Sequence, residues 1–165
     1  MAVKKFLIIS GILLVSGYGF FIFLNNQSQT NSVSPSSMTE SEIQETYGPL
    51  IPIYFGQVQM RASVADTDGE RQRGLSLTPS LPVGIVKLFV FDVPVVAPFW
   101  MKDMNYPIDI LWLDSGKKII HVESNLDPKT YPTTFGPTEP SLYVIETPAG
   151  LAVREGMNVG TSFTW

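Results

Sequence analysis

Residues 99–114 read Phe-Trp-Met-Lys-Asp-Met-Asn-Tyr-Pro-Ile-Asp-Ile-Leu-Trp-Leu-Asp, and this stretch decides the fold that we expect. The aromatic and apolar residues at 99–102 predict a short strand. Residues 107–113 predict a second strand, and the polar run at 114–117 predicts a hairpin turn. The chain would then return as a third strand at 118–122. The stretch therefore indicates a fold built from short strands.

The strand predicted at 107–113 is apolar on both faces. Side chains alternate between the two faces of a strand. The residues divide into Asp109, Leu111 and Leu113 on one face, and Ile108, Ile110 and Trp112 on the other. This pattern is typical of a strand that is covered on both sides.

Asp109 is the exception in this apolar strand. A buried carboxylate must be paired or hydrogen-bonded, because unpaired burial of a charge costs several kcal/mol or forces protonation. Lys102 is the nearest candidate partner in the sequence, and Arg71 is the second. Two structural roles are open, namely a buried ion pair and a carboxylate that accepts hydrogen bonds from loop amides. A place in a functional site is the alternative to both.

Composition excludes several classes of protein. The chain has 165 residues and a formal net charge of -4, which disfavours nucleic-acid binding. It has no cysteine, so disulfides, thiolate catalysis and thiolate metal sites are excluded. His121 is the single histidine, so a multi-histidine metal site is impossible. We expect no metal and no other cofactor.

The N-terminus predicts one transmembrane helix. Lys4 and Lys5 precede residues 6–24, which contain no charged side chain. A helix of that length spans roughly 28 Å, about the thickness of the hydrocarbon layer. We expect an uncleaved signal anchor in residues 1–24, with a cleaved signal peptide as the alternative. The two lysines place the N-terminus in the cytoplasm, so the rest of this single-pass protein would lie outside the cell membrane.

The polar segment at 25–47 predicts a disordered linker, because it is rich in Ser, Asn, Gln and Thr and cannot bury enough apolar surface. Residues 48–165 would then form one extracytoplasmic domain of ordinary size. Further strands are predicted at 50–55, 58–65, 85–91, 142–146 and 159–165, and short helices at 67–74 and 148–155. Residues 125–141 contain four prolines and predict a long loop. We therefore expect a mostly β fold, a small β-sandwich or barrel-like domain with one or two short helices.

Several blocks of this domain are similar to those of a known family. In chain order they are Glu70-Arg71-x-x-Gly74-Leu75, Leu88-Phe89-x-Phe91, Phe99-Trp100-Met101-Lys102-Asp103-Met104, Pro107-Ile108-Asp109-Ile110, Leu113-Asp114, Tyr143-Val144-Ile145-Glu146, Ala149-Gly150 and Gly160. From about Val58 to Phe163 the chain thus resembles the family catalogued as domain of unknown function 192. The resemblance implies a compact, mostly β domain, often behind a signal or anchor, and it implies no activity. Many relatives carry cysteines in the loop that matches 125–141, and any function of those thiols would be absent here.

The first functional hypothesis is a ligand-binding or accessory module rather than an enzyme. Sites of this kind are mainly apolar with a few polar groups. Aromatic residues of the stretch 99–114 would line a groove, namely Phe99, Trp100, Tyr106 and Trp112, and Asp114 would add a polar contact. The candidate binding residues are Lys102, Asp109, Trp100, Asp103 and Arg71. The partner would be an unidentified small ligand or a protein, besides the membrane.

Two other classes of function are alternatives. A hydrolase-like enzyme could use paired carboxylates, either Asp109 with Asp114 or Asp103 with Glu70. A protein-interaction domain would instead use the proline-rich segment 125–141 and the exposed end of the sheet. Clustered carboxylates in a pocket would favour the enzyme, an open aromatic groove the binding module, and a flat apolar patch the interaction domain.

Overall fold

The computed structural model of the protein describes residues 38–165. Its helices are α1 (Glu40–Tyr47), α2 (Asp68–Arg73), the 3₁₀ helix η1 (Pro128–Thr130) and α3 (Leu151–Glu155). Its strands are β1 (Leu50–Phe55), β2 (Val58–Ala65), β3 (Ile85–Val95), β4 (Phe99–Trp100), β5 (Ile108–Leu113), β6 (Ile119–Leu126), β7 (Thr134–Phe135), β8 (Ser141–Pro148) and β9 (Phe163–Thr164).

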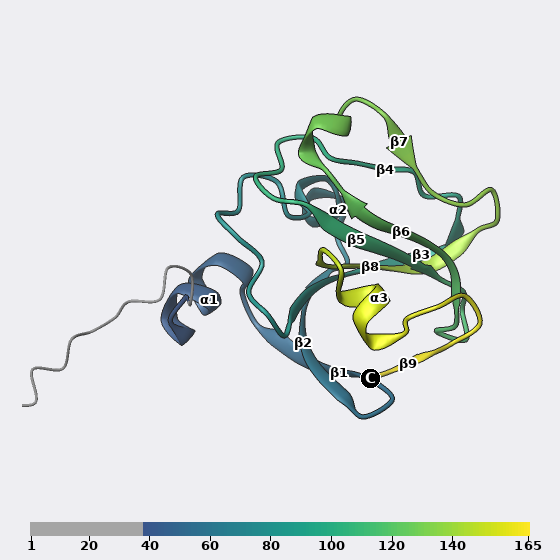
Figure 1. Ribbon diagram of the computed structural model, residues 1–165, viewed down its shortest axis with the longest axis horizontal. Coiled ribbons are helices and arrows are strands. Elements are labelled where there is room, and N and C mark those ends of the chain that lie inside the picture. Colours follow the sequence, from purple (N-terminus) through teal and green to yellow (C-terminus); the bar gives the residue numbers. More distant parts are fainter. Residues whose placement is uncertain (1–37) are drawn as a thin grey trace, which may run out of the picture. The chain divides into compact units, whose positions relative to one another are not determined.

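Seven strands form one curled, half-barrel sheet, so the predicted mostly β fold is confirmed. The strand order is β6-β5-β8-β3-β2-β1-β9, and β4 pairs with β7 in a separate two-stranded sheet. All pairs in the large sheet are antiparallel except β2 with β3. The sheet curls around α3 (Figure 1). Lys118, just before β6, forms a bridge to Ser162, just before β9, and the amide of Phe163 donates to the carbonyl of Lys117 (3.0 Å), so the two edges of the sheet meet here.

β5 is the most deeply buried strand, as the sequence predicted. All six of its residues are buried, and its side chains separate into the two hydrophobic clusters of the domain. Ile108, Ile110 and Trp112 join the cluster that also contains Phe89. Leu111 and Leu113 join the cluster on the opposite face, which contains Leu151 and Ala152 of α3. The two-faced apolar pattern therefore places β5 between two layers of packing.

The predicted hairpin turn also forms between β5 and β6. The amide of Lys117 donates to the carbonyl of Asp114 (3.0 Å), and Lys117 has a φ of 63°. The Asp114 carboxylate accepts hydrogen bonds from the amides of Gly116 (2.8 Å) and Lys118 (3.0 Å). This is the usual way in which an aspartate closes a turn on its own backbone.

β3 is longer than the sequence predicts. We expected residues 92–94 to end it, but the strand continues to Val95. Its pairing with β8 is interrupted between Val90 and Val95 by a register shift. Such an irregularity accommodates Pro94, which has no backbone N–H for a regular ladder.

Other boundaries differ as well. The last strand is confined to Phe163–Thr164, and α3 begins at Leu151 because Pro148 still belongs to β8. The segment expected to be a long loop contains η1 and β7. β7 forms through contact with a distant segment, since Phe99 of β4 pairs with Phe135, whereas η1 is capped locally by Asp127.

Ordered packing begins before Gly48, where we had expected a disordered linker to end. α1 starts at a capping box between Thr39 and Glu42, and it buries Ile43 and Tyr47. The residues 6–24 that predict an anchor lie outside the described part of the chain. Within residues 38–165, no helix has the length and apolar character needed to cross a membrane.

Candidate functional site

α2 forms one side of the candidate site, and its sequence explains where it begins and ends. Thr67 and Glu70 form the predicted capping box, in which each side chain accepts from the other residue's amide. The helix ends at Gly74, which has a φ of 52°. A Cβ atom at Gly74 would lie 3.2 Å from Cζ of Phe89, so glycine allows the helix end to approach β3 closely.

Arg71 of α2 turns inward, and the protein itself supplies its partners. Its side chain is 16% exposed and forms an ion pair with Asp68 (2.6 Å). Its guanidinium also donates to the carbonyls of Asp66 (2.5 Å) and Val90 (2.7 Å), and its central carbon lies 5.5 Å from the ring centre of Phe91. Arg71 therefore connects α2 to the middle of β3.

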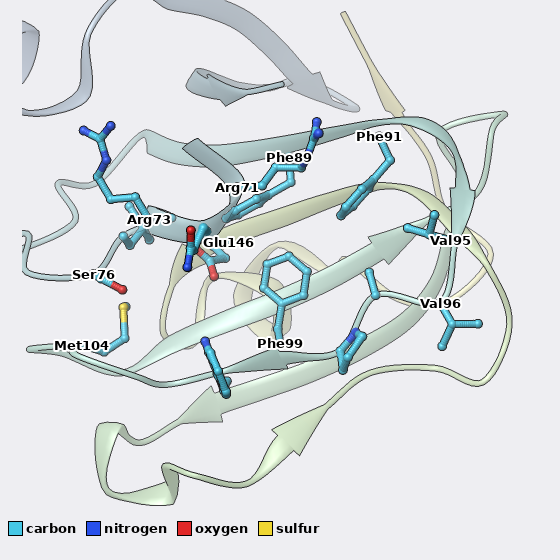
Figure 2. A pocket seen from close by; sticks show the side chains of 16 residues that line it. Arg71, Arg73, Ser76, Phe89, Phe91, Val95, Val96, Phe99, Met104 and Glu146 are labelled. Carbon is cyan, nitrogen blue, oxygen red and sulfur yellow. The ribbon is translucent and has the colours of Figure 1, made fainter. Parts of the chain in front are cut away.

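A pocket of about 400 Å³ lies between α2, β3 and the segment that leads into β4 (Figure 2). Most of its lining is apolar, and a smaller set of polar side chains borders it. The apolar side chains include Leu75, Phe89, Phe91, Val95, Val96, Phe99, Trp100 and Met104, and the polar ones are Arg71, Gln72, Arg73, Ser76 and Glu146. An apolar cavity of this size with a few polar groups is typical of small-molecule sites.

The aromatic wall of the pocket is fixed by the core. Phe99 packs edge-to-face against Phe89 (4.8 Å between ring centres) and against Trp112 (5.8 Å). Trp112 is fully buried, and its indole N–H donates to the carbonyl of Ala97 (2.8 Å). Because each ring is held by the next, the wall is formed without any ligand.

Glu146 of β8 is the polar group at the inside of the pocket. It is only 4% exposed, and its Oε2 atom is buried without a hydrogen-bond partner. Its register neighbours are Lys87 on β3 and Ile110 on β5. Burial raises the pKa of the Glu146 carboxyl to about 8, although the positive charge of Lys87 acts in the opposite direction. Burial therefore favours the neutral carboxylic acid form of Glu146.

Lys87 lies beside Glu146 but donates its hydrogen bond elsewhere. Its Nζ atom donates to Oγ of Ser63 (3.0 Å), and Ser63 in turn donates to the carbonyl of Tyr47 (2.6 Å). Burial lowers the pKa of Lys87, while the nearby carboxylates of Glu146 and Glu70 raise it. Both members of this buried pair thus shift toward their neutral forms, since desolvation is the first cause for each.

The structure brings some of the predicted site residues together and separates others. Arg71 and Trp100 both line the pocket. Lys102 and Asp103 line a smaller, adjoining depression of about 260 Å³, which Trp100 also borders. The Nζ atom of Lys102 lies 5.9 Å from the ring centre of Trp100. Asp109 lines neither hollow.

Asp109 instead accepts hydrogen bonds from loop and helix amides. Its Oδ1 atom accepts from the amides of Asn125 (2.7 Å) and Gly150 (3.0 Å), and Oδ2 accepts from the amide of Ala152 (2.9 Å). The carboxylate thus joins β5 to the end of β6 and to the start of α3. Of the two structural roles that the sequence left open, the structure shows the one with loop amides.

The other carboxylates named for catalysis also have local partners. Asp114 closes its hairpin turn, and Glu70 closes the capping box of α2. Asp103 occupies an exposed turn with a φ of 56°. In the part of the chain that the structure describes, no three His, Asp or Glu side chains gather as metal ligands would.

Sequence reasoning did not select Glu146 or Lys87 as site residues. The signal was present, because Glu146 follows the apolar run Val144-Ile145 in a predicted strand. The argument that singled out Asp109 applies equally to that position. What the sequence lacked was the pairing of β8 with β3, which places Glu146 opposite Lys87.

Solved structures are similar to this domain. A crystal structure of a protein of unknown function from Novosphingobium aromaticivorans has a TM-score of 0.66 and 27% identity, and the match covers 70% of this chain and 85% of that one. The crystal structure of a candidate transcription regulator from Sinorhizobium meliloti has a TM-score of 0.64 over 68% of this chain and 89% of that one. At 23% identity, the second likeness shows the fold alone.

Sequence comparison identifies relatives in archaea. A UPF0127 protein of Thermococcus sibiricus is 29% identical over 105 residues, which cover 64% of this chain and 66% of that protein. A UPF0127 protein of Thermococcus gammatolerans is 28% identical over 123 residues, or 74% of this chain and 73% of that protein. The profile of the family DUF192, described as "Uncharacterized ACR", matches residues 53–165. This chain therefore belongs to the DUF192 family.

Proposed function

We propose that this domain is a binding module that holds a small, largely apolar ligand in the pocket between α2, β3 and β4. The observation that carries this proposal is the buried Oε2 atom of Glu146, which lines the pocket and has no partner. An unsatisfied buried polar group costs about 1–3 kcal/mol. A ligand whose polar group forms a hydrogen bond with Glu146 would remove that cost. The apolar walls of the pocket would enclose the rest of the ligand.

The fixed aromatic wall supports the same proposal. Phe99 packs edge-to-face against both Phe89 and Trp112, so little conformational entropy is lost when a ligand enters. Val96 and Trp100 are exposed at the rim of the pocket, where a ligand could enter from solvent.

Calorimetry on the full chain tests this function. The probe is 4-phenylbutan-1-ol, which has an apolar tail and one uncharged polar group. Val96→Trp places a large side chain at the rim without altering the core, since Val96 is 56% exposed. We expect this variant to bind the probe about tenfold more weakly, which is a loss of about 1.4 kcal/mol in the free energy of binding.

The matched control is Val153→Trp, an equally large change at an exposed position of α3 outside the pocket lining. It should bind the probe as the unmodified chain does. Equal binding by both variants, or no binding by the unmodified chain, would contradict a ligand site in this pocket.

The predicted membrane anchor is a second part of the proposal. Residues 6–24 would hold the domain at the outer surface of the cell membrane, as their charge-free composition supports. The full chain expressed in a bacterium should stay in the membrane fraction after an alkaline wash, and external protease should degrade the domain in spheroplasts. A deletion of residues 1–37 is the control and should be soluble. Recovery of the full chain in the soluble fraction would overturn this assignment.

A further inference from the structure

The pocket has two chemically different ends. Arg73, Ser76 and Met104 lie at one end in Figure 2, and Val95 and Val96 lie at the other, with Phe99 between them. Glu146 lies toward the end that carries Arg73 and Ser76. A ligand that matches this lining is amphipathic, with a polar head at the first end and an apolar tail along Phe99.

Besides Glu146, the charged side chains that line the pocket itself are Arg71 and Arg73. Arg73 is exposed, and within residues 38–165 it has neither an ion-pair partner nor a side-chain hydrogen bond. Arg71 is neutralised by Asp68, whereas Lys87 approaches Glu146 from the neighbouring strand. With Glu146 protonated, these charges favour an anionic head over a cationic one.

Two of the aromatic rings that line the pocket already face a cation of the protein. Rings of this kind attract cations over their faces. The face of Phe91 is already taken by the guanidinium of Arg71, at 5.5 Å, and that of Trp100 by Lys102, at 5.9 Å. A ligand ammonium at either of these two rings would lie near a cation of the protein and be repelled by it.

We infer that the ligand is an amphipathic monocarboxylate, an inference that rests on the proposed function. Its carboxylate head contacts Glu146, Ser76 and Arg73. Its apolar tail lies toward Val95 and Val96. The Glu146 O–H donates to the ligand carboxylate, a short and strong type of hydrogen bond. The Arg73 guanidinium supplies charge, and the apolar tail fills the space beside Phe99. Glu146 is thus a proton-dependent recognition group.

The titratable groups around Glu146 determine how binding changes with pH. They are Lys87 on β3, Arg71 and Arg73 on α2, Glu70 of α2 beside Lys87, and Tyr106 in the segment before β5; the β5 neighbour itself is apolar. Burial raises the pKa of Tyr106 far above neutral pH, so its charge does not change there. Carboxylate binding requires the protonated form of Glu146, and it is lost as the pH rises through about 8.

Three probes with one tail test the inference on the full chain by calorimetry. They are 4-phenylbutanoate, 4-phenylbutan-1-ol and 4-phenylbutylamine. At about pH 7 the carboxylate should bind at least about tenfold more tightly than the alcohol, and the amine more weakly than both. Between about pH 7 and about pH 9 the carboxylate affinity should fall about tenfold, because Glu146 loses its proton.

Variants separate the contribution of each group. Glu146→Gln keeps an uncharged N–H donor, so it should retain carboxylate binding and lose most of the decrease between pH 7 and 9. Arg73→Gln should weaken the carboxylate several-fold and leave the alcohol unchanged. Arg154→Gln, an exposed arginine of α3, is the control and should change neither.

The outcomes distinguish this inference from the proposed function. Tighter binding of the amine, with affinity that rises with pH and is abolished in Glu146→Gln, would overturn the carboxylate and keep the binding pocket. Tighter binding of the alcohol than of the carboxylate would also overturn the inference of a carboxylate ligand. If none of the three probes binds, the proposed function itself fails.

Discussion

At the scale of single residues, Asp109 and Glu146 are buried carboxylates on neighbouring strands, and the fold accommodates them in different ways. Asp109 accepts three backbone N–H hydrogen bonds, which replace the hydrogen bonds to water that it loses on burial. Glu146 has no comparable donors, and burial raises its pKa to about 8. The first arrangement stabilises the fold, and the second leaves a polar group for a ligand.

Glu146 should make the stability of the free protein depend on pH. Its pKa rises on folding from 4.5 to about 8, so the folded form binds a proton that the unfolded chain has released. The stability contributed by this group is complete below about pH 4.5 and declines as the pH rises to 8, by on the order of 4 kcal/mol. Glu146→Gln should remove most of this decline.

Urea unfolding of the full chain, followed by tryptophan fluorescence from about pH 4.5 to 8, measures this effect. Glu139→Gln makes the same chemical change at an exposed position and serves as the control. Parallel stability curves for Glu146→Gln and the unmodified chain would show that Glu146 is ionised in the fold.

Asp109→Asn should destabilise the domain by about 2–3 kcal/mol, because an amide nitrogen would face a backbone donor and leave it unpaired. Lys102→Ala should not change that cost, since Lys102 does not contact Asp109. A double-mutant cycle measured by urea unfolding checks both statements. Strong coupling between the two positions would favour the ion pair that the sequence had suggested, and Asp103→Asn in the exposed turn is the control.

At the scale of elements, α2 and β3 depend on one glycine for their close approach. Gly74 ends α2 with a positive φ of 52°, and Phe89 of β3 lies directly against it. The same contact places Arg71, Arg73 and Ser76 along the pocket. The geometry of the site therefore depends on how this short helix ends.

Gly74→Ala should destabilise the domain by about 1–3 kcal/mol, from the positive φ and from the 3.2 Å approach of the new Cβ to Phe89. Gly74→Ala should also weaken the binding of 4-phenylbutan-1-ol in the pocket. Gly69→Ala in the same helix is the control, because nothing lies within 4 Å of that position. Thermal unfolding of both variants gives the comparison, and an equal effect at the two sites would contradict this account of Gly74.

At the scale of the whole molecule, the described domain extends to α1 as well as the sheet. Tyr47 donates from its hydroxyl to the carbonyl of Ser80, and its own carbonyl accepts from Ser63 of β2. Ile43 is buried in the same cluster as Phe89 and Trp112. The boundary of the domain therefore lies N-terminal to α1.

Ile43→Ala should reduce the free energy of unfolding by about 2–4 kcal/mol, as expected for truncation of a buried aliphatic side chain. Gln44→Ala, on the exposed side of the same helix, should have little effect. Urea unfolding distinguishes the two. Equal stability of Ile43→Ala and the unmodified chain would mean that α1 is not part of the cooperative unit.

Local patterns predicted the elements that are stabilised by nearby residues. Alternating or continuous apolar residues located β1, β2 and β5, and the capping box and Gly74 located α2. The same patterns missed β7 and made β4 and β9 too long, because each of these strands contains only two residues and forms where a distant strand pairs with it. They also failed for α1, whose composition is polar while its two buried residues pack against the core.

The sequence by itself determined the family, the mostly β class and the burial of β5, because each follows from residue types and their spacing along the chain. It also singled out Arg71 and Trp100, which border the pocket. Only the tertiary structure assigned Asp109 to backbone amides and placed Glu146 beside Lys87 inside an apolar cavity. The physical reason is that the ionisation and partners of a carboxyl depend on groups brought to it through space, and strand register supplies those groups.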